Sequence, residues 1–91
     1  MNSDLSDRII SFKVLLYNYL MLIMRTLHEA MVAVLKQNRR PMKAAEIAQE
    51  INRMKLYERG DRQPVPGSQI SARANNYPLL FEKEDGMIRL V

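Results

Sequence analysis

The chain has 91 residues, of which 47% are apolar and 26% charged; this composition is typical of one small globular domain and excludes a disordered chain. It contains no cysteine, which excludes disulfide bridges and thiolate metal sites and predicts a reducing, cytoplasmic compartment. The formal net charge is +4, and all of it arises after residue 24, because Asp4, Asp7, Arg8 and Lys13 cancel. A basic second part predicts a polyanionic partner, since Lys and Arg beside phosphates release counterions.

The first 25 residues predict a helix that is apolar over a wide arc. One apolar row steps by three and four residues: Leu5, Ile9, Phe12, Leu16, Tyr19 and Ile23. Such a helix needs cover, and we expect a homodimer built from this row. Packing against its own domain, or translation that begins at Met21 or Met24, are the alternatives. The apolar run Val14–Met24 is shorter than the roughly 20 residues of a membrane span, so no membrane segment is expected.

A second helix is predicted to begin at Thr26, because Thr26 and Glu29 have the spacing of a capping box. Its buried face would consist of Leu27, Ala30, Met31, Val34 and Leu35. Pro41 would stop it. Two helices that meet near Arg25 and one continuous helix to about Gln37 both fit the sequence, since neither Gly nor Pro interrupts it.

A short extended piece at residues 41–43 follows, and then a helix is predicted over residues 44–54. Ile47 and Ile51 are four residues apart and mark its buried face. Residues 57–66 are polar and contain glycine and two prolines, which predicts a loop.

The last part of the chain predicts a helix over residues 68–76 and a β-hairpin. Asp85-Gly86 separates two alternating apolar runs, residues 79–84 and 87–91, and this arrangement is a strong hairpin signal.

This order of elements predicts a mainly α fold with a small β-hairpin, namely a winged helix-turn-helix. The predicted domain spans residues 26–91, and residues 1–25 would form an N-terminal helical extension. The core is expected to include Ile47, Ile51, Ile70 and Phe81.

The helix over residues 68–76 carries side chains suited to reading duplex DNA. Gln69, Arg73 and Asn76 share one face, with Ser68 beside them, and no acidic residue lies on this helix. Arg pairs with guanine, and Gln or Asn pairs with adenine, in the major groove. An ordinary solvated face is the alternative interpretation.

Basic residues around this helix are the predicted phosphate contacts: Lys43, Arg59, Arg62, Lys83 and Arg89. For each of them taken singly, solvated surface is the alternative. The acidic residues Glu82, Glu84 and Asp85 on the hairpin argue against its tip entering a groove.

Catalytic signals are missing from the sequence. His28 is the only histidine and has no partner in a motif, and no phosphate loop, metal-ligand spacing or nucleophile motif occurs. We therefore expect a non-enzymatic domain without cofactor or metal. Arg59-Gly60-Asp61 spells a cell-adhesion tripeptide, and we interpret it as a chance occurrence.

Several segments resemble the HARE-HTH family: Arg40–Ile51 (RPMKAAEIAQEI), Pro66–Pro78 (PGSQISARANNYP), Leu80-Phe81 and Asp85–Leu90 (DGMIRL). The resemblance covers about residues 26–91. Members often have Ser or Thr as the cap of the second helix, where this chain has Lys43, which caps a helix less well. Residues 1–25 lie outside the resemblance.

The resemblance implies a winged helix that binds double-stranded DNA in transcription regulation or restriction. Such domains occur in chromatin regulators, fused to restriction endonucleases, and in the delta subunit of bacterial RNA polymerase. The polymerase case implies the alternative of a protein-interaction module that docks onto RNA polymerase or a nuclease subunit. A purely structural dimerisation unit is a third possibility.

Overall fold

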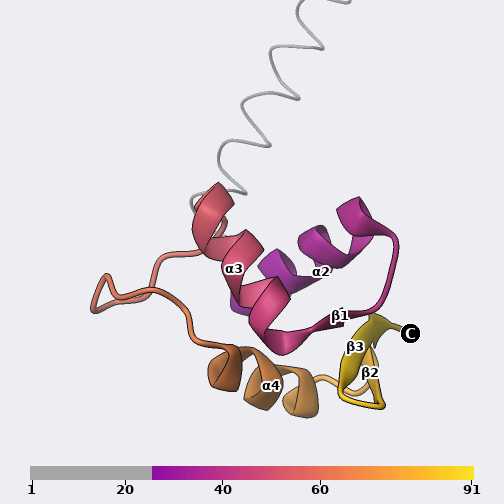
Figure 1. The fold of residues 1–91 in the computed structure, drawn as a ribbon. Coiled ribbons are helices and arrows are strands. Elements are labelled where there is room, and N and C mark those ends of the chain that lie inside the picture. The colour runs from indigo at the N-terminus through magenta and orange to yellow at the C-terminus, as the bar shows by residue number, and fades with distance from the viewer. Residues whose placement is uncertain (1–25) are drawn as a thin grey trace, which may run out of the picture.

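The computed structural model describes residues 26–91, which form three helices and a three-stranded antiparallel sheet (Figure 1). The elements in chain order are α2 (Leu27–Asn38), β1 (Met42–Lys43), α3 (Ala44–Met54), α4 (Gly67–Asn76), β2 (Phe81–Glu84) and β3 (Met87–Leu90). This arrangement confirms the predicted winged helix-turn-helix, in which the β2–β3 hairpin is the wing.

The predicted N-terminal helix and dimer interface lie outside the described residues. This applies to Leu5, Ile9, Phe12, Leu16, Tyr19 and Ile23. The homodimer therefore stays a prediction.

Helix α2 begins with the predicted capping box. The backbone N–H of Thr26 donates to the Glu29 carboxylate at 2.9 Å, and the Glu29 N–H donates to the Thr26 hydroxyl at 3.3 Å. Thr26 has an extended backbone, so the helix starts here and does not continue unbroken through this residue. At the other end Arg39 adopts the left-handed conformation (φ 54°) and donates its N–H to the Leu35 carbonyl at 2.9 Å.

Helix α3 begins with half a capping box. The Glu46 carboxylate accepts the backbone N–H of Lys43 at 2.9 Å, whereas the Lys43 side chain makes no cap hydrogen bond. An ammonium group has no acceptor, which explains why Lys43 cannot complete the box. The helix ends at Lys55, which is left-handed with φ 53°.

The extended piece at residues 41–43 becomes β1, an edge strand that pairs antiparallel with β3. In the wing, Asp85 and Gly86 have φ angles of 53° and 76°, as a two-residue hairpin turn requires. The wing is shorter than predicted. Leu79 and Leu80 belong to a turn, because the N–H groups of Leu80 and Phe81 both donate to the Tyr77 carbonyl at 3.0 Å.

The core lies between the three helices and the inner face of the sheet. The four predicted core residues, Ile47, Ile51, Ile70 and Phe81, are all buried. Leu56 and Val65 are also buried, although the sequence placed both in or beside a polar loop. Both belong to the core cluster, Leu56 shortly after the end of α3 and Val65 shortly before the start of α4.

Replacement of Ile51 tests this packing. Ile51 is completely buried on α3, so Ile51→Ala should lower the free energy of unfolding by about 2–5 kcal/mol. Gln49→Ala on the exposed face of the same helix is the control and should change it by less than about 0.5 kcal/mol. Urea unfolding measures both values, and an Ile51→Ala effect no larger than that of the control would contradict the core described here.

Candidate nucleic-acid interface

The start of α4 lies against the start of α3. A Cβ atom added to Gly67 would lie 3.2 Å from both the Cα and the backbone nitrogen of Ala45. Glycine therefore permits a backbone-to-backbone approach that a larger residue would push apart. Ile70 and Ala74 are buried on the inner face of α4 and hold the rest of the helix against the core.

Asn52 fixes the loop that leads into α4. Its side-chain Nδ2 donates to the Val65 carbonyl at 3.0 Å, and its Oδ1 accepts the Val65 N–H at 2.9 Å. The Val65 side chain is itself buried, so this residue is anchored through both backbone and side chain. The chain enters α4 directly afterwards, and the clamp therefore sets where the helix begins.

The outer face of α4 is polar. Its most exposed residues are Ser68, Ala72, Asn75 and Asn76, while Gln69 and Arg73 are partly buried along one flank. The predicted row is therefore rotated by about one position, and Asn75 was missed. Its spacing of seven from Ser68 is the signal that could have found it. No acidic residue lies on α4.

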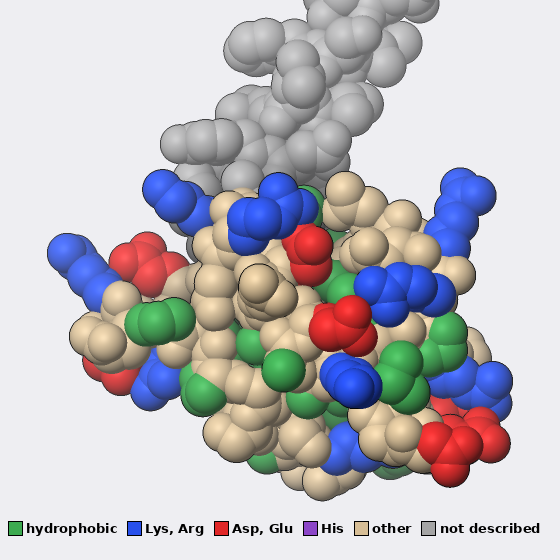
Figure 2. All heavy atoms as spheres, viewed as in Figure 1, with side chains coloured by type: hydrophobic (Ala, Val, Ile, Leu, Met, Phe, Trp, Pro, Cys, Tyr) green, Lys and Arg blue, Asp and Glu red, His purple; other side chains and the backbone are tan. Residues whose placement is uncertain are grey.

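Two basic residues predicted as phosphate contacts are placed beside α4. Lys83 on β2 donates from its ammonium group to the Ser71 hydroxyl on α4. Lys43 precedes α3, whose first turn touches Gly67, and its side chain is exposed. Basic side chains are spread over the face drawn in Figure 2, with acidic ones between them.

The other three predicted phosphate contacts are engaged elsewhere. Arg89 pairs with Glu82 at 2.7 Å on the outer face of the wing and lies 3.9 Å from Glu84. Arg59 and Arg62 line a hollow in the loop before α4, together with Lys55.

Ion pairs within this loop occupy both arginines. Arg59 binds Asp61 at 2.9 Å, so the two charged side chains of the Arg59-Gly60-Asp61 tripeptide bind each other. Arg62 lies 3.6 Å from Glu58 and is largely exposed.

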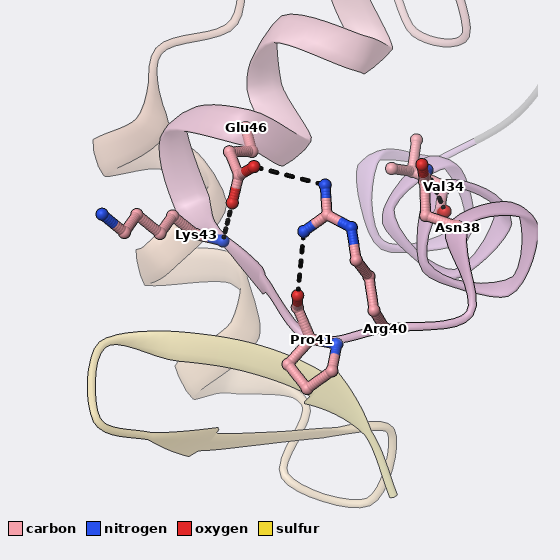
Figure 3. Close-up of polar contacts among 6 residues, drawn as sticks. All are labelled: Val34, Asn38, Arg40, Pro41, Lys43 and Glu46. Carbon is pink, nitrogen blue, oxygen red and sulfur yellow. Dashed lines mark hydrogen bonds and ion pairs between the residues drawn. The ribbon is translucent and has the colours of Figure 1, made fainter.

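The junction between β1 and α3 is organised by Glu46 (Figure 3). One carboxylate oxygen accepts the Lys43 N–H, and the other lies 3.3 Å from the Arg40 guanidinium. The backbone hydrogen bond and then Arg40 hold the pKa of Glu46 below its usual value of 4.5. The Lys43 side chain points away from this group and leaves its charge facing solvent.

Helix α3, the closely packed helix α4 and the wing together form the arrangement of a helix-turn-helix domain. A family model described as HARE-HTH, an HTH domain whose description names ASXL and restriction endonuclease, matches residues 25–89. The chain belongs to the HARE-HTH family. Neither the curated proteins nor the solved structures gave a match.

The HARE-HTH family is one of DNA-binding-type helix-turn-helix domains rather than of catalytic folds. Within residues 26–91, no group of three or more His, Cys, Asp or Glu residues could hold a metal ion. None of the described helices has the length and apolar character needed to cross a membrane.

Disruption of the Asn52 clamp should destabilise the entry to α4. Asn52→Ala leaves the partly buried backbone groups of Val65 without their side-chain partners, at a cost of about 1–3 kcal/mol. Thermal unfolding measures this loss, and limited proteolysis should show faster cleavage in residues 57–66. Asn75→Ala on the exposed face of α4 is the matched control, and equal behaviour of the two variants would exclude the clamp.

Glu46 should make stability depend on pH. Its lowered pKa means that its charge stabilises the fold above about pH 4.5, and that this contribution disappears as the pH falls through the lower folded value. The parent chain should therefore be more stable than Glu46→Gln at neutral pH, and the difference should shrink below pH 4.5. Unfolding curves of both proteins across this pH range measure the difference in stability. A difference between the parent chain and Glu46→Gln that does not vary with pH would contradict the prediction.

Proposed function

We propose that this HARE-HTH domain is a non-enzymatic module that binds double-stranded DNA by laying α4 in the major groove. The observation that carries the proposal is the outer face of α4, which is polar, free of acidic residues and held on a rigid core. An α-helix with its side chains is about 10–12 Å in diameter and fits a major groove about 12 Å wide; α4 has 10 residues and would extend about 15 Å along it.

The side chains on this face match the donor and acceptor pattern of base edges. Arg73 can bind the two acceptors of guanine, and Gln69 or Asn76 can bind adenine through its amide. The methyl group of Ala72 suits contact with a thymine methyl group, and Ser68 can bond to a base or a phosphate. Asn75 adds a second amide to the most exposed row.

Basic side chains near the start of α4 and along one side of it support this orientation. Lys43 extends from the junction near the start of α4, and Lys83 is held at its side by Ser71. Arg62, which is largely exposed and 3.6 Å from Glu58, would add positive potential from the loop. Arg59 and Arg89 should contribute least, because Asp61 and Glu82 already bind their guanidinium groups.

The acidic groups of the wing help to define the docking. Glu84 and Asp85 are exposed at its tip and Glu82 is exposed on its outer face, and all three carboxylates would be repelled by phosphates. We therefore assign the face of the wing that carries Lys83 to the DNA and exclude its tip from the groove.

The wider role forms part of the same proposal. The module would serve transcription regulation or restriction inside the cell, with residues 26–91 as the DNA-binding domain and residues 1–25 as an extension. Pairing of two copies through that extension would present two α4 helices to successive turns of a duplex, about 34 Å apart.

Arg73→Ala tests the proposed interface. Loss of a two-point contact with guanine should weaken duplex binding by about 1–3 kcal/mol, with little change in melting temperature because Arg73 makes no ion pair among the described residues. Fluorescence titration with a mixed-sequence duplex at two salt concentrations measures the affinity and its salt dependence.

Arg53→Ala is the matched control. Arg53 lies at the far end of α3 and pairs with Glu50, so its loss should leave duplex binding almost unchanged. Equal duplex affinities of the parent chain and Arg73→Ala, or a duplex affinity that does not change with salt concentration, would contradict the proposal.

A further inference from the structure

A second basic surface lies at the end of α2, away from α4. An open hollow of about 340 Å³ is formed where α2 ends, where the chain crosses to β1 and where β3 ends. In Figure 1 these segments lie on the right, whereas α4 runs along the bottom and contributes no residue to the hollow. Four of the residues that line it are basic: Lys36, Arg39, Arg40 and Arg89.

The charges around this hollow are only partly neutralised. Arg40 is paired with Glu46, and Arg89 with Glu82. Lys36 and Arg39 are exposed and form no ion pair within residues 26–91, and no acidic residue lines the hollow. The surface therefore presents uncompensated positive charge.

Helix-end electrostatics account for only part of this charge. A cation in the last turn of a helix interacts favourably with its dipole, which would explain Lys36. Arg39, however, has φ 54°, a conformation that glycine adopts with less strain. A capping role alone does not call for arginine at this position.

The rest of the lining is apolar and continues onto the neighbouring surface. Leu35, Pro41 and Leu90 complete the hollow. Val91 follows Leu90 and donates its N–H to the Leu80 carbonyl at 3.0 Å, and the side chains of Val91 and Leu80 are exposed. An apolar surface with a charged rim is typical of a protein interface, whereas a phosphate backbone offers nothing to the apolar part.

We propose that this hollow is the docking site for an acidic segment of a partner protein. Lys36 and Arg39 would bind Asp or Glu side chains of the segment, and an apolar side chain between those acids would enter the hollow. Because α4 lies outside this surface, the domain can hold DNA and the acidic partner at the same time. The proposal would stand even if α4 did not bind DNA.

A short fluorescent peptide with Phe and Leu among Asp and Glu residues is the probe, titrated against the full chain. The double variant Lys36→Glu, Arg39→Glu should weaken its binding about tenfold, as loss and reversal of two rim charges imply. Replacement of the acids in the peptide by Asn and Gln, or of Phe and Leu by Ser, should weaken binding as well.

The matched control is Arg53→Glu, Lys55→Glu. These residues occupy the last turn and the left-handed cap of α3, as Lys36 and Arg39 do on α2, so both double variants change net charge and helix ends alike. The control should keep most of the peptide affinity. Arg73→Ala should keep all of it, which separates this site from the proposed DNA interface.

Chemical-shift changes on addition of the peptide should concentrate around Leu35, Arg39 and Leu90 rather than on α4. An equal loss of peptide affinity in the two double variants would show that only the net charge of the chain matters, and this would overturn the proposal. Displacement of the peptide by duplex DNA would show that the hollow binds nucleic acid. Shifts at the same residues that grow with protein concentration alone would assign it to a second copy of the chain, and either result overturns the proposal.

Discussion

The close approach of Gly67 to Ala45 is the constraint on which the orientation of α4 depends. Two helix starts meet backbone to backbone, so close that a Cβ atom on Gly67 would require the Ala45 backbone to shift by a few tenths of an ångström. Ile70 and Ala74 are buried on the inner side of α4, so the helix has little freedom to rotate. The polar outer face that we propose for DNA binding therefore follows from a packing contact on the opposite side.

Charge on this domain is distributed by the sheet register as much as by sequence. Lys83 pairs in register with the buried Ile88 and so faces α4, where it reaches Ser71. Arg89 pairs in register with Glu82 and lies on the outer face, where that carboxylate binds it. The structure thus separates a basic surface around α4 from a second one at the end of α2, with acidic residues near the tip of the wing.

Local signals predicted the elements well because they depend on neighbouring residues. The capping box of Thr26 and Glu29 and the Asp85-Gly86 turn both appear where they were predicted. The rotation of α4 was less well predicted, since helical spacing gives a face only to within about one residue. The hairpin start was placed too early, because alternating apolar residues cannot distinguish a strand from the turn at Leu79 and Leu80.

By itself the sequence determined the fold class, the family, most of the core and the acid-free character of α4, because periodicity, caps and turn residues are local properties. Only the tertiary structure decided which charges remain available. Whether Arg89 is paired, whether Lys83 lies beside α4, and whether Lys36 and Arg39 share a hollow with Leu90 depend on strand register and packing between segments far apart in the chain.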